Sequence, residues 1–222
     1  LSRARGSELA GEVLRIGATT IDMLPDTAAD GVALHDPVTL HKVPSLTPGD
    51  HWIGRIIDPY GKPLDGKPLP SGRESRPVIT SPPLAASRRP MGERMSTGLA
   101  VLNTMLPIVR GQRVGLFAGS GVGKSRLLAQ LARGMDADIV VIALIGERGR
   151  EVREFIDDIL GETLAHSVVV ASTGDESAMQ RRLAPKTAMS VAEYFRAQGH
   201  KVLLILDSAT RFAHAARDVA LA

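Results

Sequence analysis

A glycine-rich run at residues 118–125 reads AGSGVGKS and limits the folds that this chain can adopt. It matches the phosphate-binding pattern G-x-x-x-x-G-K-[ST], known as Walker A, with Ala118 at the first glycine position. Glycines let backbone N–H groups curl around phosphate oxygens, and the following helix points its positive end at them. The pattern therefore predicts a strand before the loop, a helix after it, and a nucleoside triphosphate ligand.

Individual roles follow from the same pattern. Lys124 is predicted to reach the β- and γ-phosphates and so to act in catalysis, and the Ser125 hydroxyl is predicted to ligate Mg²⁺. We predict that nucleotide is bound by the loop and the first helical turn, through Gly119, Ser120, Gly121, Val122, Gly123, Lys124, Ser125 and Arg126.

Strand-like and helix-like segments alternate around and after this loop. Strands are predicted at residues 113–117, 139–145, 167–171 and 201–206, and helices at 124–134, 150–160 and 176–198. Pro185 is expected to break or kink the last of these helices. This order predicts an α/β fold with a mostly parallel sheet and right-handed crossovers.

Two of the predicted strands end in acidic residues. The run VLLILD ends at Asp207, which is a Walker B pattern, and a carboxylate there can help to hold Mg²⁺ beside the phosphate loop. The strand at 139–145 is followed by GERGRE, where Glu147 could polarise the attacking water and Arg148 could neutralise developing charge. On these residues alone, the second cluster stays open to another interpretation, because a Glu/Arg cluster that opens a helix is usually a solvated first turn.

The residues before the phosphate loop have a different character. Glycine, proline and aspartate separate short apolar runs at 11–16, 19–24, 38–40 and 52–57, which predicts a small β domain over residues 1–80. Prolines indicate an extended linker at 81–95, and residues 96–222 form the predicted nucleotide-binding domain. Because the chain starts at Leu1 without Met and stops within a helical run, we expect it to be part of a longer protein.

Composition removes several classes of function. The chain has no cysteine, which excludes disulfides, zinc–cysteine sites, iron–sulfur clusters and thiol catalysis and fits a cytoplasmic protein. Its longest apolar runs fall far short of the ~20 residues that a transmembrane helix needs. With 27 basic against 24 acidic residues, the charge bias is mild, and we expect no stable nucleic-acid partner. The 6 histidines show no metal-ligand spacing.

Several stretches together resemble one family. The runs MSTGLAVLNTML, PIVRGQ, AGSGVGKS, LIGERGREVREFIDDILGE and VLLILDSATRFAHA are similar to the catalytic ATPases of bacterial type III export, and among them to the flagellum-specific ATPases. That family is similar in turn to the catalytic subunit of rotary ATP synthases. The resemblance covers nearly the whole chain, and implies a RecA-like P-loop core preceded by part of a small β-barrel domain.

The resemblance also implies function and partners. It implies Mg-ATP hydrolysis that energises export of flagellar proteins, with Glu147 orienting the hydrolytic water, Arg148 near the γ-phosphate, and Ser125 and Asp207 serving Mg²⁺. It implies a homohexamer that meets an export regulator or stator, export chaperones and an export gate. Such a protein is cytoplasmic and peripheral at the inner-membrane export apparatus. The family's arginine finger, adenine-stacking aromatic and helical C-terminal domain lie beyond these 222 residues, so we expect this stretch alone to hydrolyse ATP poorly.

Other functions remain open at this stage. They are an injectisome secretion ATPase, a rotary ATP synthase subunit, a Rho-like hexameric RNA helicase, and a non-catalytic nucleotide-binding fragment. The low aromatic content, 3%, and the GERGREV run argue against the helicase, which places an RNA-binding β domain before this core.

Overall fold

Four parallel strands form the central sheet of the computed structural model, which describes residues 9–41, 43–119 and 121–222. In spatial order these strands are β4 (Arg55–Ile57), β7 (Ser167–Thr173), β6 (Ile139–Glu147) and β8 (Val202–Asp207). Each neighbouring pair is parallel. The predicted α/β fold with a parallel sheet is therefore confirmed.

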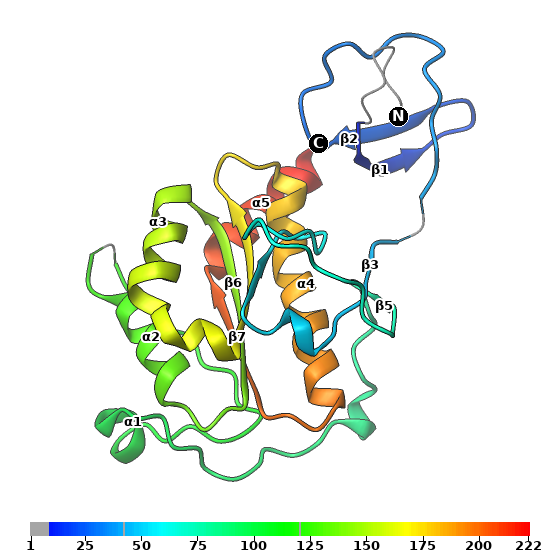
Figure 1. Cartoon of the computed structure of the whole chain (residues 1–222). Coiled ribbons are helices and arrows are strands. Elements are labelled where there is room, and N and C mark those ends of the chain that lie inside the picture. Colours follow the sequence, from blue (N-terminus) through cyan, green and yellow to red (C-terminus); the bar gives the residue numbers. More distant parts are fainter. Residues whose placement is uncertain (1–8, 42, 120) are drawn as a thin grey trace.

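Helices cover both faces of this sheet (Figure 1). One face carries α2 (Lys124–Gly134) and α3 (Gly149–Glu154), which continues into a π-helical turn, Phe155–Leu160. The other face carries α4 (Ala178–Ala197), with α5 (Ala209–Leu221) packed beside it. The short α1 (Ala100–Thr104) lies on the chain that leads to the phosphate loop.

The core explains why the strands read as continuous apolar runs. Val141 and its alternate neighbours on β6 pack toward α4, whereas Ile142 and its alternate neighbours pack toward α2 and α3. Both side chains are 0% exposed. A parallel sheet covered on both faces needs apolar residues at every position, which is the pattern that the sequence shows.

Most of the predicted elements after the phosphate loop are present, with ends that differ by a few residues. Pro185 does not break the helix, because α4 runs from Ala178 to Ala197. Pro185 is buried. A proline in a helix interior loses one backbone hydrogen bond. Here the helix keeps its apolar contacts with β6 and β7, which outweigh that loss.

The predicted strand at residues 113–117 is not formed. These residues have no strand pairing, and the side chain of Phe117 is 97% exposed. Apolar composition shows only that a segment can be a strand, because a ladder also needs a partner. Gly111, Gly115 and Gly119 fall at every fourth position here, and glycine weakens strand formation. The phosphate loop thus follows an extended segment, although it does open a helix as predicted.

The first part of the chain contributes a hairpin and an edge strand. The hairpin consists of β1 (Gly11–Ile16) and β2 (Ile21–Pro25), close to the predicted segments, and residues 38–40 form no strand. Two-residue strands, β3 (Ser45–Leu46) and β5 (Arg76–Pro77), pair with each other. The prediction placed residues 52–57 in a separate β domain, whereas β4 pairs with β7 in the central sheet. Sequence periodicity carries no information about such a distant parallel partner.

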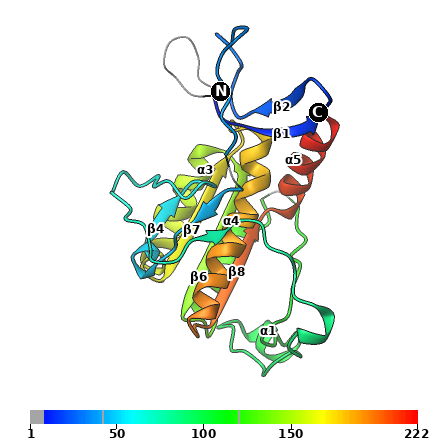
Figure 2. The same ribbon diagram turned by 90° about the vertical axis from the view of Figure 1, so that its right-hand side faces the viewer.

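The β1–β2 hairpin contacts the loop after β4 and helix α4 through polar groups. The Tyr60 hydroxyl donates a hydrogen bond of 2.6 Å to Asp26, which follows β2, and Arg182 of α4 forms an ion pair with Glu12 of β1. Burial and the nearby carboxylates, Asp26 first among them, raise the pKa of Tyr60. The end of α5 also lies beside this hairpin in both ribbon views (Figures 1 and 2).

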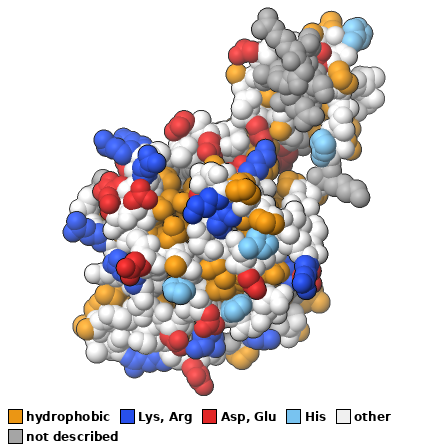
Figure 3. Space-filling model, in the orientation of Figure 1, with side chains coloured by type: hydrophobic (Ala, Val, Ile, Leu, Met, Phe, Trp, Pro, Cys, Tyr) orange, Lys and Arg blue, Asp and Glu red, His pale blue; other side chains and the backbone are white. Residues whose placement is uncertain are grey.

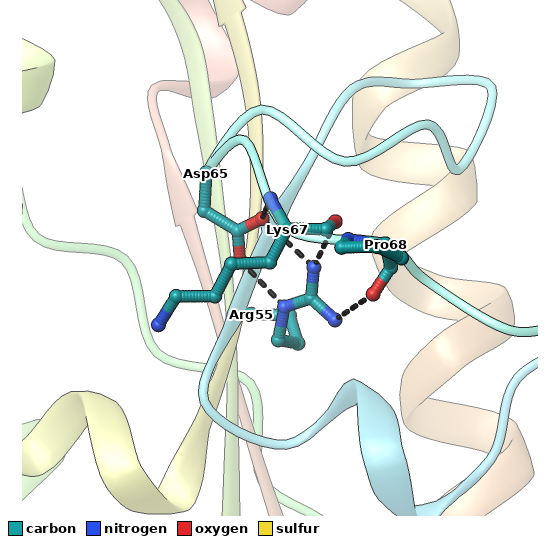
Figure 4. Close-up of polar contacts among 4 residues, drawn as sticks. All are labelled: Arg55, Asp65, Lys67 and Pro68. Carbon is teal, nitrogen blue, oxygen red and sulfur yellow. Dashed lines mark hydrogen bonds and ion pairs between the residues drawn. The ribbon is translucent and has the colours of Figure 1, made fainter.

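The loop that follows β4 is closed by one arginine (Figure 4). Arg55 donates hydrogen bonds to both carboxylate oxygens of Asp65, at 2.5 and 2.8 Å, and to the carbonyls of Lys67 and Pro68. Both charged side chains are only 13% exposed. The hydrogen bonds from Arg55 hold the pKa of Asp65 at about 2, below its ordinary value of 3.8.

The surface carries charges of both signs. On the face drawn in Figure 3, Lys and Arg side chains lie among Asp and Glu side chains rather than in one continuous basic area. Among the helices of the described residues, none has the length and apolar character needed to cross a bilayer.

Candidate functional site

A cavity of about 480 Å³ opens at the carboxyl ends of β6 and β8, beside the start of α2. Its walls come from the phosphate loop, the first turn of α2, the ends of two sheet strands, α3 and α5. In open α/β sheets, ligands bind outside the carboxyl ends of the strands. The cavity therefore lies where a P-loop protein would hold phosphates.

Lys124 and Asp207 meet in this cavity, although they are far apart in the sequence. The Lys124 ammonium group donates a hydrogen bond to the Asp207 carboxylate, whose side chain is 5% exposed. Asp207 ends β8 and Lys124 begins α2, so the sheet edge and the helix start bring the two motifs together. Ser125, the next residue on α2, also lines the cavity and is half-buried.

The loop glycines line the same cavity. Gly121 and Gly123 have φ angles of +77° and +94°, a backbone region that side chains with a Cβ rarely adopt. Gly119 lines the cavity as well, whereas Val122, which is 68% exposed, is not among the described residues that line it. The prediction for Ser120 lies outside the described residues. The loop thus presents backbone, not side chains, to the cavity.

Glu147 is the last residue of β6 and faces the cavity with its side chain 16% exposed. Its backbone carbonyl accepts a hydrogen bond of 3.0 Å from Gly174. Burial raises the pKa of Glu147, an ion pair with Arg211 opposes that rise, and a hydrogen bond shared with Glu151 adds to it. The same shared hydrogen bond lowers the pKa of Glu151. A carboxylate with a raised pKa beside a phosphate site is suited to accept a proton from water.

Arg211 is a cavity residue that the sequence analysis missed. It lies in the first turn of α5, four positions after Asp207, and its guanidinium forms the ion pair with Glu147. Gly146 has a φ of +69°, and a Cβ there would come within 3.1 Å of the Arg211 side chain. Glycine therefore leaves the space through which Arg211 reaches Glu147. The sequence signal that could have identified Arg211 is an arginine one turn into the helix that follows Asp207.

Arg148 is placed differently from the prediction. The described residues that line the cavity do not include it, and its side chain is 79% exposed. It precedes the first residue of α3 and pairs with Glu151 at 3.4 Å. Its predicted role near the γ-phosphate stays a prediction.

The residues present fit Mg²⁺ bound together with a nucleotide. Ser125 offers a hydroxyl and Asp207 a buried carboxylate, both on the wall of the cavity. Within the described ranges, no three His, Asp or Glu side chains form a cluster that could hold a metal. Mg²⁺ usually keeps several waters and takes one or two protein oxygens plus substrate phosphates, so this sparse donor set suits it.

Comparison with known proteins identifies the same part of the chain. A family model described as "ATP synthase alpha/beta family, nucleotide-binding domain" matches residues 98–222, a range that contains the whole cavity wall. The chain belongs to the ATP synthase alpha/beta family. Membership accounts for the loop, the sheet strands β6, β7 and β8 and the two acidic strand ends as parts of one nucleotide-binding domain, whereas β4 lies outside the matched residues.

Within this family, the chain is similar to export ATPases. It is 46% identical over 213 residues to the flagellum-specific ATP synthase of Agrobacterium fabrum, covering 96% of this chain and 45% of that protein. It is 42% identical over 230 residues to the type 3 secretion system ATPase of Pseudomonas syringae pv. tomato, covering 100% of this chain and 51% of that protein. The chain spans about half the length of the curated relatives it matches.

A solved structure is also similar to this chain. The assembled ATPase EscN, in complex with its central stalk EscO from the enteropathogenic E. coli type III secretion system, matches with a TM-score of 0.88 and 38% identity. The match covers 99% of this chain and 55% of that one. The RecA-like P-loop fold that the resemblance implied is therefore confirmed.

Proposed function

We propose that this domain binds Mg-ATP in the cavity and hydrolyses it. The observation that carries the proposal is that one cavity joins Lys124 and Asp207 with Glu147. In this proposal the loop from Gly119 to Arg126 binds the phosphate chain. Ser125 and Asp207 hold Mg²⁺, which when bound neutralises charge on the phosphate oxygens.

In this proposal, side chains of the domain position the phosphates and the attacking water, and one of them accepts a proton. Lys124 exchanges the Asp207 carboxylate for the β- and γ-phosphate oxygens when nucleotide binds, since one ammonium group cannot serve both at full strength. Glu147 orients the attacking water, and its raised pKa makes it a better proton acceptor. Arg211 holds the Glu147 side chain through their ion pair, so we assign it a positioning role. Arg148 is retained as a candidate for contact with the γ-phosphate.

We further propose that the complete protein energises type III export of flagellar proteins. The proposal has it unload substrates from chaperones and deliver them to the export gate. It acts there as a homohexamer with an export regulator or stator, in the cytoplasm and peripheral to the inner-membrane export apparatus. Support comes from the flagellum-specific relatives at 42–49% identity and from the assembled state of EscN. The division into a partial β-barrel domain, a linker and the ATPase domain also stays a proposal.

The test is Lys124→Ala in the complete gene of the source organism, measured as swimming and flagellin export. Both should be lost, with growth and respiration normal, because the phosphates lose their main side-chain cation. Lys201→Ala is the matched control, since Lys201 pairs with Asp136 at the surface and lies away from the cavity. Normal swimming in the Lys124 variant would reject flagellar export. A fall in secretion of other proteins would then favour the injectisome function, which the Pseudomonas syringae relative also supports.

A further inference from the structure

Arg126 lies where two cavities meet. It lines the phosphate-loop cavity, and it also lines a second cavity of about 290 Å³ between α2 and the helical segment that follows α3. Gln130 and Arg133 of α2 form one wall of the second cavity, and Glu154 and Asp158 form the other. Glu154 lines both cavities as Arg126 does. The second cavity is therefore a side extension of the first.

The Arg126 side chain has no competing partner in the part of the chain that the structure describes. It is exposed and takes part in no hydrogen bond or ion pair there. Arg133, its neighbour on the same helix face, is instead occupied by a hydrogen bond of 2.9 Å to the Ile159 carbonyl. Arg126 is thus a free cation beside the phosphate loop, whereas Arg133 is already engaged.

Arg126 leaves α2 in a different direction from Lys124, although both residues line the phosphate-loop cavity. Two residues along an α-helix differ in direction by roughly 200°, because each turn holds about 3.6 residues. In agreement, Lys124 contacts Asp207 of β8, while Arg126 faces the α3 side with Glu154. The two cations of this helical turn therefore serve different ends of a ligand held in the loop.

The direction of the nucleotide follows from the same arrangement. In a phosphate loop, backbone N–H groups cradle the α- and β-phosphates, and the lysine and the Mg²⁺ ligands take the β/γ end. The β/γ end thus lies toward Lys124, Asp207 and Glu147. The opposite side, where Arg126 lies, is left for the α-phosphate and the nucleoside that it carries.

We propose that the Arg126 guanidinium binds the α-phosphate end of the nucleotide, a part that ATP and ADP share. This inference rests on the proposed nucleotide binding. The contact does not distinguish substrate from product, so Arg126 sets the affinity for nucleotide and not the choice between ATP and ADP. Arg126 tightens the binding of both and so slows the release of ADP.

The size of the effect follows from the exposure of the side chain. A charge-assisted contact at an exposed position contributes modestly, so loss of Arg126 should weaken binding by about 3- to 10-fold. The effect should shrink as salt rises, because the Debye length falls from about 10 Å at 0.1 M to about 3 Å at 1 M.

The experiment is calorimetric titration of the full-length protein with Mg-ADP and with a non-hydrolysable ATP analogue. The variants are Arg126→Ala and, as matched control, Arg153→Ala, because Arg153 is an exposed arginine of α3 that pairs with Asp157 and lines neither cavity. Lys124→Ala tests the proposed function in the same assay. We expect Arg126→Ala to weaken both ligands equally, by about 3- to 10-fold at low salt, and Arg153→Ala to leave both unchanged.

The outcomes separate the two proposals. If Lys124→Ala abolishes binding while Arg126→Ala has no effect, nucleotide binding stands and the Arg126 inference is overturned. It is also overturned if Arg126→Ala weakens only the triphosphate, since the contact would then lie at the γ end, or if Arg153→Ala has an equal effect. If the unaltered protein binds neither ligand, the proposed function itself fails.

Discussion

Asp65→Asn should destabilise the protein in a way that depends on pH. The substitution keeps the shape of the side chain but removes the charge that Arg55 pairs with twice (Figure 4). Both partners are 13% exposed, so water screens the pair poorly. A pKa of about 2 in place of the ordinary 3.8 corresponds to about 2 kcal/mol of stability at neutral pH.

The sign of the pH dependence follows from the direction of that pKa change. Because folding depresses the pKa of Asp65, the stabilisation is fully present above 3.8 and is lost as the pH falls toward about 2. Urea unfolding at neutral pH should therefore show the variant to be about 2 kcal/mol less stable than the unaltered protein. Near pH 3, about half of that difference should remain.

A control variant distinguishes the effect of the Arg55–Asp65 pair from the effect of removing any surface charge. Arg15 and Asp22 form an ion pair within the β1–β2 hairpin, with side chains 79% and 46% exposed. Exposed pairs contribute little, so Asp22→Asn should change the unfolding free energy by less than about 0.5 kcal/mol. The reasoning is refuted if Asp65→Asn is equally small, or if its effect is the same at pH 3 as at pH 7.

Two further predictions concern Glu147. Glu147→Gln should keep Mg-ATP affinity by calorimetry and lower the turnover of the complete protein by at least about 100-fold, because the amide cannot accept the proton of the attacking water. Surviving turnover would show that another group performs this step. Arg211→Met should raise the pKa of Glu147 further, because Arg211 opposes the effect of burial. The acid limb of the ATPase pH profile should then move to higher pH, and an unmoved limb would contradict the positioning role of Arg211.

Local patterns in the sequence were sufficient for much of the site. Asp207 and Glu147 each follow an apolar run that forms a buried parallel strand. Parallel strands place their carboxyl ends at one sheet edge, so the position of both carboxylates could be predicted from chain order alone. Glycine spacing likewise located the loop and the start of α2 at Lys124. Which of these residues act in catalysis remains a prediction.

Local patterns could not predict contacts between residues that are far apart in the sequence. Nothing in the local sequence indicates that β4 pairs with β7, because a parallel partner can lie anywhere along the chain. The same holds for residues 113–117, whose apolar composition predicted a strand that has no partner in the structure. Strand formation depends on a neighbour, and sequence periodicity reports only which face of a segment could be buried.

Residue type and short-range spacing were enough to predict the nucleotide-binding fold class, the phosphate loop and the two acidic strand ends. Three features could be seen only once the chain was folded: Arg211 reaches Glu147, Arg148 is exposed and does not line the cavity, and Arg126 lines two cavities. These features depend on how helices pack on the sheet. Side-chain direction at a distance is fixed by that packing and not by neighbouring residues in the chain.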